Sequence, residues 1–148
     1  PSAALLAIGG AFEVIFVTLA DPSSPTWTAQ IEHEVAELSW VGSRALIVGR
    51  DGWLALADPS DGEIQDIAVI PGLLCAVAMD DGQHLLLGCD GSDTGDHIFY
   101  GLLFGMDLES DDPYEEMWPI NVEGSDQAVS SVHAIQWIPT DDDDDRSQ

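Results

Sequence analysis

Lysine is absent from this sequence of 148 residues, and arginine occurs only at Arg44, Arg50 and Arg146. Against these three cations stand 28 Asp plus Glu residues, which gives a formal net charge of −25 at pH 7. Such a surface repels nucleic-acid phosphates and anionic membranes, so we expect no direct nucleic-acid contact and no membrane partner. It suits a protein partner, in particular a basic one. A high-salt environment and a piece of a larger, more balanced protein both remain open as explanations of the acidity.

Cysteine is scarce, and the motifs of catalytic sites are missing. Cys75 and Cys89 each lie in an apolar stretch, so we expect buried free thiols rather than a metal or redox pair. No phosphate-binding loop, G-x-S-x-G elbow or G-x-G-x-x-G fingerprint is present. The four histidines form no metal-binding spacing. The sequence therefore predicts no cofactor and no enzymatic activity.

The sequence also lacks a convincing membrane span. Residues 3–20 are nearly uncharged, but Glu13 interrupts them, Gly9 and Gly10 divide them, and no basic residue precedes them. A signal peptide needs a positive flank and a span needs about 20 apolar residues. We predict two buried strands around a Gly-Gly turn, and a cytoplasmic location, with the nucleus as the alternative.

What the sequence does contain is a repeat of about forty residues within a chain that is 45% hydrophobic. Leu46 follows Leu5 by 41 positions, and Leu85 follows Leu46 by 39. Each of these apolar segments is followed by a second one that ends in Asp and then by a turn-rich cluster. The repeated segments are 4–10, 45–52 and 84–91; the terminal acids are Asp21, Asp58 and Asp107; the turn clusters are 22–25, 59–62 and 109–113.

A third set of segments precedes these repeats. Residues 35–40 match residues 74–79, and residues 132–137 match both. Asp80-Asp81-Gly82 supplies a tight hairpin turn. Short apolar segments that turn residues separate about every ten positions predict antiparallel all-β structure rather than helices.

The repeat resembles the WD40 family, whose blades have four strands and a period of about 40–45 residues. The middle unit, residues 33–70, carries the resemblance: His33 precedes an innermost strand, and Asp61-Gly62-Glu63 forms a turn before a fourth strand. The sequence departs from the family in two places. The Trp-Asp dipeptide is replaced by Ala57-Asp58 and its equivalents, and Glu32 rather than Gly precedes His33.

The resemblance implies an all-β chain of four-stranded antiparallel β-propeller blades, forming a partial propeller of about three blades. Three blades do not comfortably close a ring, since propellers have typically four to eight. A larger propeller, a pair of copies forming a ring, and another packing of the sheets remain open. We divide the chain into a partial blade (1–32), a blade (33–71), a blade with long loops (72–131), a strand that starts a next blade or completes the first (132–139), and an acidic disordered tail (140–148).

One loop has the pattern of a cation site. Asp90, Ser92, Thr94 and Asp96 place oxygen ligands at alternate positions before or around Gly95, as in a Ca²⁺ loop. Gly101 stands where an EF-hand needs its bidentate Glu, so a polar loop between strands is the favoured interpretation. Trp40 and Trp137 hold equivalent positions, which favours core packing between blades. Trp27 and Trp118 fall near loops and are candidate interface anchors, although core packing is the favoured interpretation for them as well.

These observations favour a non-enzymatic scaffold for protein–protein contacts, in which rigid sheets display loops to a partner. A homodimer or an assembly with further blades is compatible with the blade count. The alternatives are a propeller-type enzyme or a domain that binds a small ligand or Ca²⁺, and an acidic β-sandwich or barrel.

Overall fold

A computed structural model describes residues 5–18, 20–90, 103–120 and 135. These residues form strands and turns, and none of them belongs to a helix able to cross a membrane. The strands are β1 (Leu5–Gly9), β2 (Glu13–Thr18), β3 (Asp21–Gln30), β4 (Val35–Val41), β5 (Arg44–Gly49), β6 (Trp53–Ala57), β7 (Ile64–Val69), β8 (Leu73–Ala78), β9 (His84–Cys89), β10 (Leu103–Asp107) and β11 (Trp118–Pro119).

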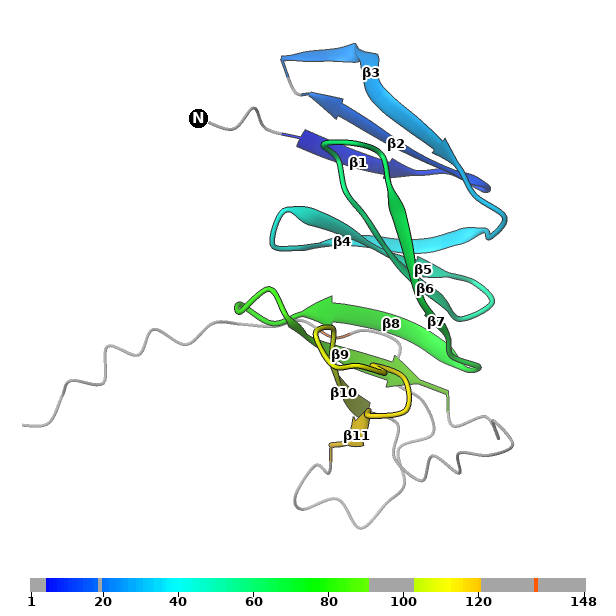
Figure 1. Cartoon of the computed structure of the whole chain (residues 1–148). Coiled ribbons are helices and arrows are strands. Elements are labelled where there is room, and N and C mark those ends of the chain that lie inside the picture. Colours follow the sequence, from blue (N-terminus) through cyan, green and yellow to red (C-terminus); the bar gives the residue numbers. More distant parts are fainter. Residues whose placement is uncertain (1–4, 19, 91–102, 121–134, 136–148) are drawn as a thin grey trace, which may run out of the picture.

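The strands make three antiparallel sheets that lie one above another (Figure 1). Sheet A has three strands in the order β1-β2-β3, sheet B has the order β4-β5-β6-β7, and sheet C has the order β8-β9-β10-β11. In each sheet, strands that follow one another in sequence are neighbours in space. The predicted all-β class with four-stranded antiparallel sheets is confirmed by sheets B and C.

The two central strands of the middle sheet, β5 and β6, are buried on both faces because they are apolar at consecutive positions rather than at alternate ones. The larger aliphatic side chains of this sheet face sheet C, where Leu54 is fully buried. The core between sheets B and C comprises Val41, Leu46, Val48, Leu54, Leu56 and Ile70 from one side and Leu73, Ala76, Leu85, Leu87, Cys89, Phe104 and Met106 from the other.

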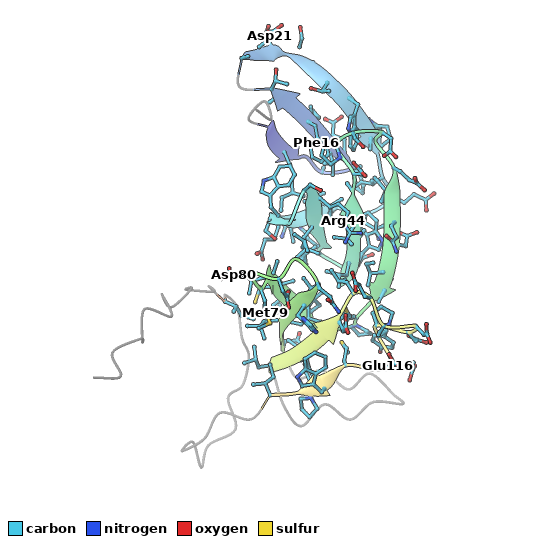
Figure 2. All side chains as sticks on the ribbon, turned by 60° about the vertical axis from the view of Figure 1, so that its left-hand side comes forward. Phe16, Asp21, Arg44, Met79, Asp80 and Glu116 are labelled. Carbon is cyan, nitrogen blue, oxygen red and sulfur yellow. The ribbon has the colours of Figure 1, made fainter. Side chains whose placement is uncertain are left out.

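The opposite face of sheet B carries mainly small residues, and aromatic rings of sheet A fill the space above them. Phe16 is fully buried where sheets A and B meet (Figure 2). Its ring stacks at a tilt on Trp27, with 4.4 Å between the ring centroids. This core comprises Val14, Phe16, Ala45, Ile47, Trp53, Ala55 and Ala57. Alanines of sheet B and the large rings above them thus fill the core between sheets A and B.

The sequence prediction is wrong about one turn. Residues 22–25 were predicted as a turn cluster, but they lie within β3, and the chain reverses before Asp21. The β2–β3 register shifts on both sides of Val17, which pairs with Pro25. Proline is tolerated there because β3 is an edge strand with irregular pairing, so a missing N–H donor interrupts no central ladder.

Candidate interaction surface

The first polar cluster to consider lies at the start of the middle sheet and joins β4 to the β5–β6 turn. His33 Nδ1 lies 2.6 Å from Asp51 Oδ2, and the imidazole stacks on Trp53 at 4.3 Å. Trp53 Nε1 donates to Asp66 Oδ1 at 2.7 Å. Although desolvation opposes it, the hydrogen bond from His33 lowers the pKa of Asp51. His33 therefore has a structural role, because its contacts join the segment before β4 to Asp51 in the β5–β6 turn and to Trp53 in β6.

The Asp residues that end the repeated segments also have a structural role. Asp58 Oδ1 accepts hydrogen bonds from the Ser60 amide and hydroxyl, which hold the β6–β7 turn and lower the Asp58 pKa. Asp107 Oδ1 accepts from Gln83 Nε2 and from the Glu109 amide, both at 2.9 Å. These carboxylates mimic the hydrogen bonds of a backbone turn. Their recurrence in the sequence therefore indicates turn formation.

A different arrangement occurs on the face of sheet C that points away from sheet B. Val77 pairs with Leu86, Leu86 with Gly105, and Gly105 with Trp118, so the four residues form one row across the sheet. A Cβ atom added to Gly105 would lie 2.2 Å from Trp118 Cε2, which shows that the indole lies directly against the glycine. Trp118 is nevertheless 41% exposed. We call Val77, Leu86, Leu103, Gly105 and Trp118 the Trp118 face.

Charged groups border the Trp118 face at the next row of the sheet. His84 pairs with Asp107, and its ring meets Trp118 edge-on at 6.2 Å. Its Nδ1 is hydrogen-bonded to Asp81, and its Nε2 lies 3.8 Å from Asp107 Oδ2. The bond to Asp81 raises the pKa of His84. Backbone hydrogen bonds from His84 and Gln83 lower the pKa of Asp81 to about 2. The border is therefore an imidazole held by two carboxylates.

The turns at this end of sheets B and C are acidic. A Cβ added to Gly82 would lie 3.9 Å from Gly42 Cα, so the β4–β5 and β8–β9 turns meet. Figure 2 places Arg44 in the middle sheet, Met79 and Asp80 on one side of the lower sheet, and Glu116 on the other. Within the described ranges, the acidic groups of these turns are Asp58, Asp61, Glu63, Asp80, Asp81, Asp107, Glu109, Asp111, Asp112, Glu115 and Glu116, and the cationic side chains are Arg44 and, when protonated, His84.

A hollow of about 200 Å³ lies near the same end of sheet B, lined by Arg44, Leu56, Asp58, Glu63 and Gln65. Small-molecule pockets are typically about 300–1,000 Å³ and mainly apolar. This hollow is smaller and is lined mostly by charged and polar side chains, so it is a poor match for a cofactor site.

The predicted cation loop is only partly described. Asp90 follows β9, and its amide donates to the Gly72 carbonyl at 2.8 Å, whereas Ser92, Thr94 and Asp96 lie outside the described residues. In the parts of the chain that the structure describes, no group of three or more His, Cys, Asp or Glu residues is arranged to hold a metal ion. His97 and His133 also lie outside those parts.

The predictions for the two cysteines and for Trp40 have different outcomes. Cys75 and Cys89 are buried thiols as predicted, and burial raises both thiol pKa values, that of Cys89 to about 12. A thiol with so high a pKa is a poor nucleophile. Core packing predicted for Trp40 is only partly correct, because its side chain is 38% exposed. Residues 132–139, apart from Ile135, and the tail 140–148 lie outside the described residues.

No protein-family model matches this chain, and no curated protein matches it in sequence. Two solved structures resemble it in fold. One is the N-terminal domain of Nup159, with a TM-score of 0.48, 11% identity, and coverage of 70% of this chain and 24% of that chain. The other is a complex of S. cerevisiae Dbp5 bound to Nup159, Gle1, IP6 and ADP, with a TM-score of 0.50, 11% identity, and coverage of 77% of this chain and 26% of that chain.

This chain therefore spans about a quarter of the length of the chains it resembles. At 11% identity the likeness concerns the fold alone. The similar domains are β-propellers, and the stacked four-stranded sheets described above have the arrangement of propeller blades. The prediction of a partial propeller of about three blades is confirmed.

Proposed function

We propose that this chain is a non-enzymatic protein-interaction domain that binds a basic segment of a partner through the Trp118 face. The observation that carries the proposal is the position of Trp118: its indole lies against Gly105, is 41% exposed, and meets the ring of His84, which the carboxylates of Asp81 and Asp107 hold. Exposed Trp residues are enriched among the residues that dominate binding energy. The carboxylates favour a cationic group at the border of the apolar row.

Several further observations support this proposal. The net charge of −25 attracts basic partners over long range and accelerates their association. The Trp118 face belongs to a sheet whose other face is fixed in the core, so the contact residues are preorganised. The S. cerevisiae complex includes Nup159 bound to protein partners, which is a precedent for contacts by a domain of similar fold.

We also propose that the blades are of WD40 type. The unit 33–70 carries the sequence resemblance, and its His33 makes the hydrogen bond to Asp51 and the stack on Trp53 described above. These contacts join the segment before the innermost strand to the turn between the second and third strands.

A peptide-binding experiment tests the proposed function. An immobilised library of short peptides would vary net charge in both directions, with or without one leucine or aromatic residue, and would be probed with the fluorescently labelled full chain. We expect binding to basic peptides that carry the apolar residue, weaker binding as the KCl concentration rises, and a loss of about tenfold or more in affinity for Trp118→Ala.

The matched control is Phe12→Ala, which removes another exposed aromatic ring, 55% exposed, from the β1–β2 turn. Its affinity for the same peptides should equal that of the unchanged chain. Equal losses in the two variants, or equal binding of acidic and basic peptides, would overturn the proposed function.

A further inference from the structure

The two carboxylate oxygens of Asp107 have different surroundings. Its Oδ1 accepts hydrogen bonds from Gln83 Nε2 and from the Glu109 amide, both at 2.9 Å. Its Oδ2 lies 3.8 Å from His84 Nε2, which is longer than a hydrogen bond. The side chain of Asp107 is 31% exposed. Oδ1 thus holds the turn after β10, whereas Oδ2 can accept a further donor without loss of a bond that the fold uses.

The imidazole of His84 is held through its other nitrogen. Nδ1 is hydrogen-bonded to Asp81 Oδ2, while Asp81 Oδ1 accepts from the backbone amides of Gln83 and His84 at 3.0 and 2.9 Å. An ionised carboxylate can only accept, so Nδ1 carries a hydrogen whether the ring is charged or neutral. The charge of the ring therefore depends on one hydrogen, the one on Nε2 beside Asp107.

Protonation at Nε2 changes what this pair of atoms can bind. In the imidazolium form, Nε2–H is a donor, and the positive charge of the ring offsets the carboxylate of Asp107. In the neutral form, the lone pair of His84 Nε2 and the Oδ2 of Asp107 are two acceptors 3.8 Å apart with no hydrogen between them. A cationic donor can then interact with both atoms. Only the neutral form therefore offers a site for a second cation.

The charged groups around His84 favour such a cation. Within the described ranges they are Asp81 in the β8–β9 turn, Asp107 at the end of β10, and Glu109 in the turn that follows. The hydrogen bond to Asp81 raises the pKa of His84 against desolvation, and the charges of the other two carboxylates add to this. The indole of Trp118 meets the imidazole edge-on at 6.2 Å. Loss of the proton leaves carboxylates near an exposed indole, which suits a planar guanidinium.

We propose that a proton on His84 and an arginine of the partner compete for Asp107, so that acid releases the partner from the Trp118 face. The guanidinium would donate from its fork of N–H groups to Asp107 Oδ2 and His84 Nε2. This inference rests on the proposed function and adds to it the partner's residue and a control by pH. Because linkage is reciprocal, the bound arginine must also lower the affinity of His84 for its proton by the same factor.

The test uses a rhodamine-labelled, acetylated and amidated peptide in which arginines flank one leucine. It is titrated into the full chain and followed by fluorescence anisotropy, at pH values from about 5.5 to about 8.5, a range in which arginine keeps its charge. A second peptide has citrulline, a neutral analogue that keeps N–H donors, in place of each arginine. We expect the affinity for the arginine peptide to rise about fivefold or more with pH, and that for the citrulline peptide to stay low and level.

Three variants locate the effect. In Asp107→Asn an oxygen remains to accept the bonds of the turn, but the charge is lost, so the arginine peptide should bind about fivefold more weakly at the alkaline end of the range. Asp58→Asn is the matched control, since it makes the same change in net charge at the equivalent position of sheet B, and its affinity should be unchanged. His84→Gln should give a level pH profile, although the other histidines remain.

NMR measures the same competition from the side of the proton. The ring C–H signals of His84, identified by their absence in His84→Gln, should give a lower pKa when the arginine peptide is saturating. An unchanged pKa, or a pH-dependent affinity that persists in His84→Gln, would overturn this inference and leave the proposed function standing. Failure of the arginine peptide to bind at every pH would overturn both. Tighter binding by Arg146→Gln would assign the site to the chain's own arginine and would also overturn the inference.

Discussion

The indole Nε1 of Trp27 donates a hydrogen bond of 2.8 Å to the carbonyl oxygen of Pro59, which joins β3 of sheet A to the β6–β7 turn of sheet B. The same indole covers Gly62 in that turn, since a Cβ added there would lie 3.1 Å from Trp27 Cδ2. One side chain thus contacts both the aromatic core around Phe16 and the turn held by Asp58. This contact is a specific bond between two sheets whose shared core is apolar.

Replacement of Trp27 by Phe tests the value of this bond. Phenylalanine keeps an aromatic ring against Phe16 but has no N–H donor. A neutral hydrogen bond contributes about 0.5–1.5 kcal/mol, so we expect the free energy of unfolding to fall by about 1 kcal/mol in urea titrations. Trp118→Phe is the control, with an expected change within about 0.5 kcal/mol because that ring is exposed. Equal losses in the two variants would show that the bond adds nothing.

Much of the fold could be predicted because the repeated segments fall on equivalent strands of successive sheets. Leu46 and Leu85, identified by spacing alone, both lie in second strands and are fully buried in the same core. The Asp residues that close each repeat predicted turns, and Asp58 and Asp107 do cap turns through local hydrogen bonds. Such contacts join residues that are few positions apart, so a sequence pattern can predict them.

The docking features could not be predicted in the same way. Gly105 and Trp118 are 13 positions apart and meet only because β10 and β11 pair in one register. The equivalence of Trp40 and Trp137 in the repeat predicted a core residue, yet 38% of Trp40 is exposed. Sheet A likewise contains Pro22 and Pro25 within a strand, although proline usually marks a turn. In each of these cases the outcome depends on how residues far apart in the sequence come together in the sheets.

The turn between β5 and β6 depends on a glycine. Gly52 has a φ of +89°, and a Cβ there would lie 2.0 Å from the Ile70 carbonyl oxygen. Gly42 has a φ of +58° but no heavy atom within 4 Å of such a Cβ. The left-handed conformation costs an L-residue about 1–2 kcal/mol, so Gly42→Ala should lower the free energy of unfolding by that amount. Gly52→Ala should lower it clearly more, because the backbone near Ile70 must also move. Urea titrations of both variants would contradict this account if the losses were equal.

The cluster around His84 makes stability depend on pH in a defined direction. The pKa of His84 is raised above its ordinary value of 6.5, so its protonated form stabilises the fold. That contribution is complete below pH 6.5 and disappears as the pH rises through the higher folded value. The pKa of Asp81 is lowered from 3.8 to about 2, so its contribution is complete above 3.8 and disappears as the pH falls toward 2. The combined contribution is therefore greatest between these two limits.

Thermal unfolding followed by circular dichroism would measure this dependence. For the unchanged chain, we expect the melting temperature to fall as the pH is raised from below 6.5 into the alkaline range. His84→Gln should lack much of this fall, because glutamine does not titrate. Asp81→Asn should also reduce it, since the hydrogen bond to Asp81 is the main cause of the raised pKa of His84. A profile of His84→Gln that is parallel to that of the unchanged chain would rule out the assignment.

The last prediction concerns Gly105, which determines where the Trp118 indole lies. A Cβ at this position would overlap the ring, with Cε2 at 2.2 Å and Cζ2 at 2.3 Å. Because Trp118 is exposed on one side, the ring can move outward, so Gly105→Ala should lower the free energy of unfolding by less than about 1.5 kcal/mol. Fluorine NMR of the chain labelled with fluorotryptophan should show one shifted resonance, identified by its absence in Trp118→Phe. The same variant should weaken binding of basic peptides at the Trp118 face, because the ring is no longer held in the geometry that preorganises it. An unshifted Trp118 resonance would mean that the indole does not lie on Gly105, whereas a shifted resonance with unchanged peptide affinity would show that its position does not contribute to binding.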